Sequence, residues 1–310
     1  MALYARHHGP PLAPDDVWNA WSFEPSVLIP LALLVLVYFW GMRNVWRRAG
    51  REHGIQRRQY LSFAAALVSL LIAFVSPLDA LSDALFTAHM VQHLILIMVA
   101  APLLVMSNVP LAFLWALPRT QAQGLGFRWN QSSVLARIWQ TLDNPVFAWF
   151  VFTITLWLWH APKFFQAALE NEGIHILEHV TFLLTSMLFW WVLLKPSAQK
   201  YRQYGMAVAY LFTTVLQSAV LGALMTFTER PWYAYYADLS PAWGLTPLQD
   251  QQFAGLMMWM PGGAVFTLLT ILYFAAWLRA LERRSARSQK RNATSARKEL
   301  QKKARFNGSA

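Results

Sequence analysis

Seven long apolar stretches are the feature of this sequence that most limits the folds open to it. A helix that crosses a bilayer needs about 20 predominantly apolar residues, with roughly 17 to 25 tolerated. Hydrophobic residues make up 56% and charged residues only 13% of the chain, which excludes an ordinary water-soluble domain. The predicted spans are residues 26–42, 60–76, 86–106, 145–160, 175–194, 206–227 and 253–278.

Basic residues divide unevenly between the loops that join these spans. If the N-terminus lies outside, 23 of the 26 Lys and Arg residues face the cytoplasm, and only Arg6, Lys163 and Arg230 lie outside. Lys and Arg near spans collect on the cytoplasmic side of a membrane. We therefore predict an all-α, polytopic membrane protein with a seven-helix transmembrane bundle, its N-terminus outside and its C-terminus cytoplasmic. Residues 1–25 form an outer N-terminal segment, 26–278 the seven-span membrane domain and 279–310 a basic cytoplasmic tail.

Four segments call for separate interpretation. The first apolar run lacks a basic leader and is interpreted as a retained span. Residues 110–117 are apolar but too short to cross, so we expect them at the inner interface or dipping back. The aromatic residues of 228–252 predict an ordered outer cap or a docking patch. The basic tail is expected to be a partly disordered arm that lies on anionic lipid. A net charge of +11 could suggest nucleic acid as a partner, but the high apolar content of the chain favours a bilayer.

Five of the eight histidines lie in or at the predicted spans, at one depth. They are His89 and His93 on the third span, His160 at the end of the fourth, and His175 and His179 at the start of the fifth. At 1.5 Å per residue, all lie within about two helical turns of the outer boundary. Polar side chains inside a membrane are costly unless they face the bundle interior and find partners. A single histidine could be a satisfied helix-end residue, but two i, i+4 pairs and a fifth ring predict a shared metal or cofactor site.

The ligand types available to a metal are imidazole, thioether, carboxylate and backbone carbonyl. The absence of cysteine excludes disulfides, thiolate metal sites, iron–sulfur clusters and covalent c-type haem. Met257 and Met260 are i, i+3 neighbours in the seventh span, and thioether with imidazole suits Cu(I), although methionine is also ordinary packing material. The Pro261-Gly262-Gly263 run is expected to interrupt this helix beside a cavity. Asp79 and Asp83 either accept hydrogen bonds from ligand imidazoles or face water.

Two other chemistries remain open from the residues alone. His175-Ile-Leu-Glu178-His179 matches the H-x-x-E-H pattern of inverted zinc proteases, in which the Glu activates water. The parallel pair His89 and His93 has Gln92 where an acid would be needed, and short patterns recur by chance. A b-type haem held by one histidine from each of the third and fifth spans is the second alternative, with a role in electron transfer.

Four ordered motifs carry a family resemblance. They are residues 85–94 with Ala101-Pro102-Leu103-Leu104, Trp159-His160-Ala161-Pro162 with Phe164-Phe165 and Ala168-Leu169, His175 to His179 leading to Phe189-Trp190-Trp191, and Met257-Met258-Trp259-Met260-Pro261-Gly262-Gly263. Together they resemble the CtaG family of cytochrome c oxidase assembly factors. The N-terminal segment and the basic tail carry no such resemblance.

This resemblance implies a non-enzymatic, seven-span protein of the bacterial plasma membrane that is required for assembly of active caa(3)-type cytochrome c oxidase. It also implies a role in copper delivery, with oxidase subunits or a copper chaperone as partners. The spacing of the histidines by itself shows only an outward-facing site. The expected ligands are therefore His89, His93, His160, His175 and His179, with Met257 or Met260 assisting.

Overall fold

The computed structural model describes residues 12–50, 54–118, 120–121, 132–195 and 200–307. Every regular element in those residues is helical, which confirms the predicted all-α class. The chain divides into two compact units, one of residues 1–195 and 214–264 and the other of residues 196–213 and 265–310. The candidate histidines all belong to the first unit.

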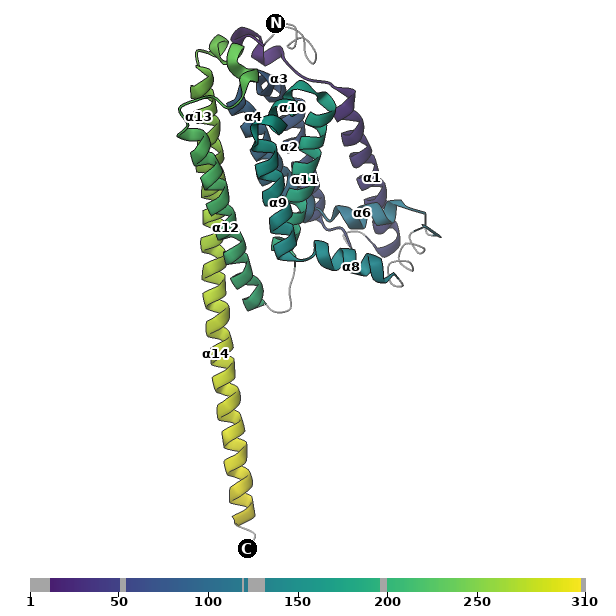
Figure 1. Ribbon diagram of the computed structural model, residues 1–310. Helices are drawn as coiled ribbons and strands as arrows, with labels where there is room; N and C mark the ends of the chain where they lie inside the picture. The colour runs from purple at the N-terminus through teal and green to yellow at the C-terminus, as the bar shows by residue number, and fades with distance from the viewer. Residues whose placement is uncertain (1–11, 51–53, 119, 122–131, 196–199, 308–310) are drawn as a thin grey trace. The chain divides into compact units, whose positions relative to one another are not determined.

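The first unit is built from short and long helices in series (Figure 1). Its N-terminal half contains the 3-10 helix η2 (Pro14–Asn19), α1 (Pro25–Ala49), α2 (Arg57–Phe74), α3 (Pro77–Ala84), α4 (Phe86–Ile95), the π-helical turn η3 (Leu96–Ala100), α5 (Ala101–Met106) and α6 (Val109–Ala116). Next come α8 (Ser133–Leu142), α9 (Pro145–His160), α10 (Pro162–Glu170) and α11 (Glu172–Leu194). The unit ends with part of α12 (Lys200–Thr226), the 3-10 helices η4 (Ala234–Asp238) and η5 (Ser240–Trp243), α13 (Pro247–Met257) and the π-helical turn η6 (Met258–Gly262).

The second unit consists of the first part of α12 and most of α14 (Gly263–Asn307). Within it, the ring of Trp277 lies against Gly205, where an added Cβ would come within 3.1 Å of the indole. The expectation of a partly disordered tail is wrong, because α14 remains helical to Asn307. Ala, Arg, Lys and Glu are strong helix formers and dominate this stretch, which explains the helix without any apolar face.

Several helices are long and apolar enough to cross a bilayer, so the chain is a multi-pass membrane protein. Within the described residues, five qualify individually, and up to seven if each of two bent pairs forms one span. The pairs are α2 with α3, bent by 42°, and α8 with α9, bent by 66°. Each bend falls where a polar residue is followed by proline, at Ser76-Pro77 and at Asn144-Pro145. The side-chain oxygens of Ser76 and Asn144 cap the second helix of each pair. The count of seven and the orientation of the termini stay predictions.

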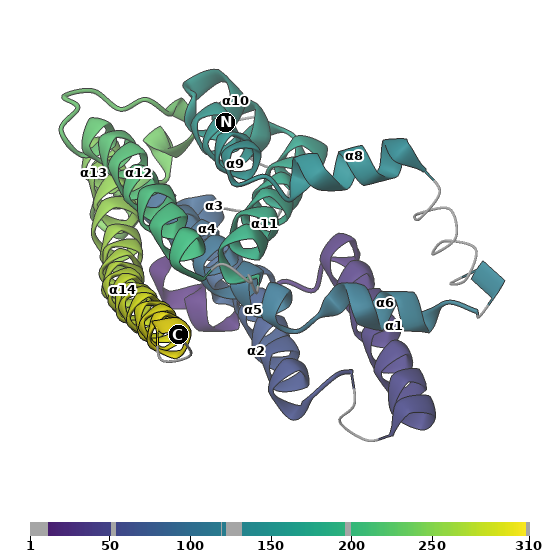
Figure 2. The same cartoon turned by 90° about the horizontal axis from the view of Figure 1, so that it is seen from below.

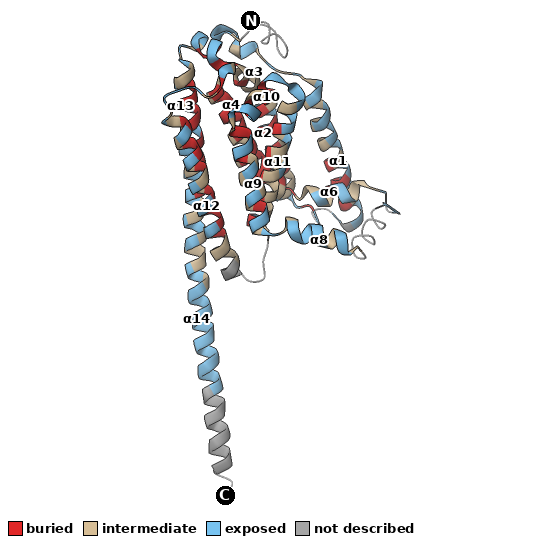
Figure 3. Cartoon of the chain, viewed as in Figure 1, coloured by how far each residue is buried: buried red, intermediate tan, exposed pale blue. Residues whose placement is uncertain are grey.

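The continuous run of α4, η3 and α5 lies at the centre of the first unit. Helices α2 and α11 pack along it, and α13 packs against α4 (Figure 2). The buried residues gather where these helices face one another, while α8 and the outer side of α1 are largely exposed (Figure 3). An apolar exposed surface is what a helix presents to lipid.

Helix α6 corresponds to the apolar stretch that is too short to cross. The chain turns at Asn108, which adopts a left-handed φ of 58°, and α6 then packs against α1. Gly41 of α1 lies so close to the Ala112 backbone that no Cβ would fit there. This close approach explains why glycine stands in the middle of an apolar helix.

Two helical runs, one with Pro102 and one with Pro261, continue through a π-helical turn. The predicted interruption at Pro261 is therefore wrong, because η6 carries the helix past the proline with a local widening. In η3, just before Pro102, the carbonyl of Ile97 accepts a hydrogen bond from the Trp190 indole at 2.8 Å. Single π turns relieve the hydrogen bond that proline cannot donate, and they are common beside functional sites.

Candidate metal centre

Two facing helices bring four imidazoles together. Helix α4 carries His89 and His93, and α11 carries His175 and His179. The ring centroids are 4.4 Å apart within each pair and 5.1 Å apart between His93 and His179. The i, i+4 spacing thus places both pairs on the faces that meet, as the sequence predicted.

These side chains form two groups of three possible metal ligands that share His89. One group is His89, His175 and His179, and the other is His89, His93 and Glu178. The ligand atoms of each group lie within 4.8 Å of one another. We call them the three-histidine group and the glutamate group.

The distances in the glutamate group suit a shared ion better than a direct contact. The Glu178 oxygens lie 3.9 Å from Nε2 of His89 and 3.9 Å from Nε2 of His93. Hydrogen bonds of this kind end near about 3.2 Å. Metal–ligand bonds of about 2.0–2.2 Å allow two ligands of one ion to be up to about 4.4 Å apart.

The polar atoms of the glutamate group lack other partners. Both nitrogens of His89 and His93 and both oxygens of Glu178 are buried, and among the described residues none makes a hydrogen bond to them. The exposed fraction is 0% for His89 and for Glu178, and 3% for His93. A buried polar group left unsatisfied costs about 1–3 kcal/mol, so a bound cation would relieve a real penalty. The donor set therefore fits a metal ion.

Sequence reasoning treated Glu178 only as the water-activating acid of a hydrolase and did not predict it as a ligand. The signal was available, since Glu178 follows His175 by three residues and so shares its helix face. Its complete burial between His89 and His93 is what the sequence did not show.

The fifth histidine, His160, lies beside the cluster at the end of α9. Its Nδ1 is 2.7 Å from the Leu156 carbonyl, and its Nε2 is buried without a hydrogen bond to any described residue. Its ring is 6.2 Å from that of Phe182, which in turn is 4.7 Å from the His93 ring. His160 belongs to neither group of three, and its role as a ligand stays a prediction.

Met257 and Met260 differ from the histidines in burial. Their exposed fractions are 36% and 65%, whereas His89, His93 and His160 are almost fully buried. Met257 is the last residue of α13, and Met260 lies in the π-helical turn η6 that follows it. Their proposed assistance in metal binding also stays a prediction.

An aromatic wall encloses the cluster. The Phe165 ring lies 5.1 Å from that of His89 and 4.6 Å from that of Tyr233. The Tyr233 hydroxyl donates to the carbonyl of His160 at 2.8 Å. Burial, and secondarily the Glu178 carboxylate, raise the pKa of Tyr233, which keeps its phenol protonated as a donor. Tyr233 belongs to the aromatic segment 228–252, which is ordered as the cap that the sequence predicted as one of two alternatives.

A distant carboxylate fixes the helix that carries His89 and His93. Asp250 accepts hydrogen bonds from the backbone N–H groups of Phe86 and Thr87, at 2.8 and 2.9 Å, and from the Ser240 hydroxyl at 2.9 Å. Leu85, at the N-cap position of α4, has no side chain that could do this. Asp250 is fully buried and holds the first turn of α4, one turn before His89.

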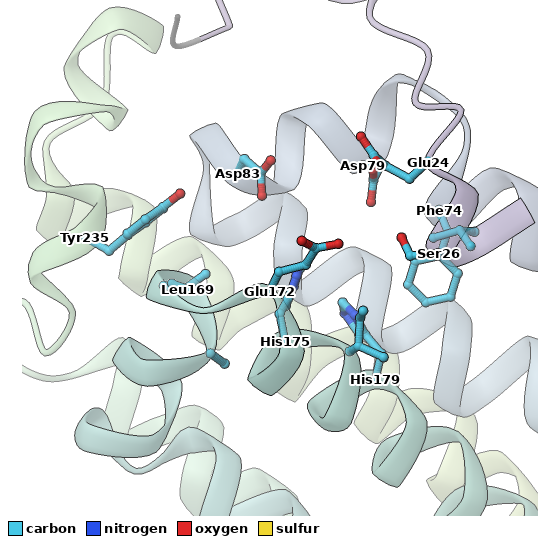
Figure 4. Close-up of a pocket in the computed structure, with 13 residues that line it drawn as sticks. Glu24, Ser26, Phe74, Asp79, Asp83, Leu169, Glu172, His175, His179 and Tyr235 are labelled. Atoms are coloured by element: carbon cyan, nitrogen blue, oxygen red, sulfur yellow. The ribbon is translucent and has the colours of Figure 1, made fainter. Parts of the chain in front are cut away.

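A pocket of about 120 Å³ leads from the surface to His175 and His179 (Figure 4). The carboxylates of Glu24, Asp79 and Asp83 line it, together with that of Glu172. Asp79 also accepts a hydrogen bond from the Gln92 amide at 2.9 Å, and Gln92 lies between the two histidines of α4 in the chain. Asp79 and Asp83 therefore border the pocket in front of the histidines.

Comparison with known protein families shows to which family the chain belongs. Residues 36–280 match the family model of the cytochrome c oxidase caa3 assembly factor, Caa3_CtaG. The chain belongs to this family. All seven predicted ligands lie inside the matched segment of this Caa3_CtaG member, and the resemblance drawn from four motifs is confirmed.

The Caa3_CtaG chain also resembles longer mycobacterial proteins. Uncharacterized proteins of Mycobacterium bovis and Mycobacterium tuberculosis are each 23% identical to it over 284 residues, and one of Mycobacterium leprae is 24% identical over 278. The alignments cover 88% to 90% of this chain but 42% of each relative, so the chain spans about two fifths of their length. No solved structure matches it significantly.

Proposed function

We propose that this protein is a non-catalytic assembly factor that binds copper and supplies it to a caa3-type cytochrome c oxidase, directly or through a copper chaperone, in the bacterial plasma membrane. The observation that carries the proposal is the set of buried donor atoms on His89, His93 and Glu178 that make no hydrogen bond to any described residue. Membership of the oxidase assembly family supports the destination of the metal.

The chemistry of the donors supports copper that is bound and later released. Imidazole nitrogen suits copper, and neutral or carboxylate ligands bind it less tightly than thiolates do. The chain has no cysteine, so its copper affinity is limited by histidine and glutamate. Bound copper would supply the metal that the oxidase needs, while His89, His93, His175, His179 and Glu178 would hold it.

Metal analysis of the purified protein tests the proposal. We expect about one copper per chain, lost on combining His89→Ala with His93→Ala, because these changes remove donor atoms from both groups of three. His53→Ala, which changes a histidine outside the predicted spans, is the matched control and should keep the metal. Oxidase assembly in cells should fail with the double variant and proceed with the control.

Two outcomes would contradict the proposal. Copper that persists after both histidine pairs are changed to alanine would remove the ligand assignment. An intense Soret band in the visible spectrum of the purified protein would favour the alternative of a b-type haem held by the same residues.

A further inference from the structure

The pocket of Figure 4 points to a route for the metal, an inference that rests on the proposed function. We propose that Glu24, Asp79, Asp83 and Glu172 form an acidic vestibule, which captures a metal cation from the surrounding water and passes it to the three-histidine group. The four carboxylates come from three parts of the chain, the residue before α1, helix α3 and the first turn of α11.

The charged side chains that line the vestibule among the described residues are carboxylates. Four of the thirteen described residues that line the pocket are acidic, and none of the thirteen is Lys or Arg. The volume of about 120 Å³ greatly exceeds the roughly 10–15 Å³ that one water needs. A cation can therefore occupy this space with part of its hydration shell.

The vestibule ends on imidazoles, which distinguishes it from an ordinary solvated acidic patch. His175 and His179 line its wall (Figure 4). The Nε2 atom of His179 is buried without a hydrogen bond to any described residue, and both nitrogens of the fully buried His89 are in the same state. The donor atoms of His89, His175 and His179 lie within 4.8 Å of one another. The carboxylates thus adjoin a set of lone pairs suited to a cation.

This arrangement sorts its ligands by strength along the path. A cleft lined by one sign of charge raises the local concentration of counter-ions, and with it the association rate, by about 10 to 1,000 times. Carboxylate oxygen suits copper less well than imidazole does, so an ion held first by the vestibule gains by moving inward. The vestibule should therefore govern the rate of loading and leave the amount of metal bound unchanged.

Stopped-flow mixing of the purified protein with Cu²⁺ tests this inference, with quenching of tryptophan fluorescence as the signal. The test variant combines Asp83→Asn and Glu172→Gln. Asp79 is left intact because it also holds Gln92. The matched control combines Asp238→Asn and Glu229→Gln, two exposed carboxylates that do not line the pocket, so that both variants lose the same charge.

We expect the vestibule variant to load Cu²⁺ about tenfold more slowly at low salt, and the difference to shrink as ionic strength rises. The control should load at the rate of the unaltered protein, and all three proteins should bind the same amount of copper at equilibrium. Equal rates at low salt would overturn the vestibule while leaving the metal site in place. Loss of bound copper in the vestibule variant would also overturn it, by making the carboxylates ligands. Failure of the proposed function is distinguishable, because the unaltered protein would then bind no Cu²⁺ at all.

Discussion

His89 has a special place among the ligands because both groups of three include it. His89→Ala removes a donor from each group, whereas His93→Ala and His175→Ala each leave one group complete. Changes to residues that support the ligands of a metal site typically weaken metal affinity by about 10- to 100-fold. Because His89 would itself be a ligand, we expect His89→Ala to weaken copper binding by more than about 100-fold. The other two variants should lose less, as measured by copper titration against a competing chelator.

The comparison also tests whether the two groups are separate positions. If all three single variants lose copper affinity equally, the four histidines and Glu178 act as one undivided site. A circular dichroism spectrum of each variant controls for loss of the helical fold.

Glu178 permits a sharp distinction between ligand and catalyst. Glu178→Gln keeps the size of the side chain and replaces a buried carboxyl group whose oxygens have no hydrogen-bond partner among the described residues. If Glu178 is a ligand, copper affinity should fall because the amide binds a metal cation less well than a carboxylate does, while the thermal midpoint of the metal-free protein stays equal because no hydrogen bond to a described residue is lost. A hydrolase would show the opposite, with metal retained and turnover abolished.

At the scale of the element, the position of α4 depends on Asp250. Asp250→Asn keeps the shape of the side chain but removes its charge, weakening hydrogen bonds to two backbone N–H groups and to Ser240. Hydrogen bonds to charged groups contribute about 1.5–3 kcal/mol, so we expect a loss of stability of that size and a lower thermal midpoint in detergent. Asp238→Asn, at an exposed position of the same cap, is the control. An unchanged thermal midpoint for Asp250→Asn would show that α4 begins correctly without the hydrogen bonds to the Asp250 carboxylate.

The sequence predicts helices and helix faces well and long-range partners poorly. The i, i+4 spacing was sufficient to place two imidazoles on each facing surface, because helix geometry alone determines it. Asp250 could not be assigned to α4 from the sequence, because it lies 164 residues after Phe86 and no local sequence pattern connects the two positions. Glu178 was visible as an acid, but only packing shows that it lies between two histidines.

The errors at the level of elements have local causes. Pro261 was expected to interrupt its helix, because one missing N–H breaks the regular ladder, but a π turn absorbs the defect within the helix. The basic tail was expected to be partly disordered because it is polar and basic, whereas its helix formers favour the helix that is present. In both cases local backbone preference outweighed the feature on which the prediction relied.

At the scale of the whole molecule, the orientation in the membrane decides what the vestibule can reach. The pocket adjoins the start of α1, α3 and the first turn of α11. With the N-terminus outside, as the 23 basic residues of the inner segments predict, this end faces the outer aqueous phase. Copper would then load from the outside.

The absence of cysteine makes this orientation directly testable, because single cysteines can serve as reporters. Lys163→Cys places a thiol on α10, the helix whose Ala168 and Leu169 line the vestibule pocket, and Arg287→Cys places one on α14. Both positions are exposed. A membrane-impermeant thiol reagent should label position 163 in intact cells and position 287 only after lysis. The reverse pattern would place the vestibule on the cytoplasmic side. Copper would then have to be loaded from the cell interior, and loading from the outside would be excluded.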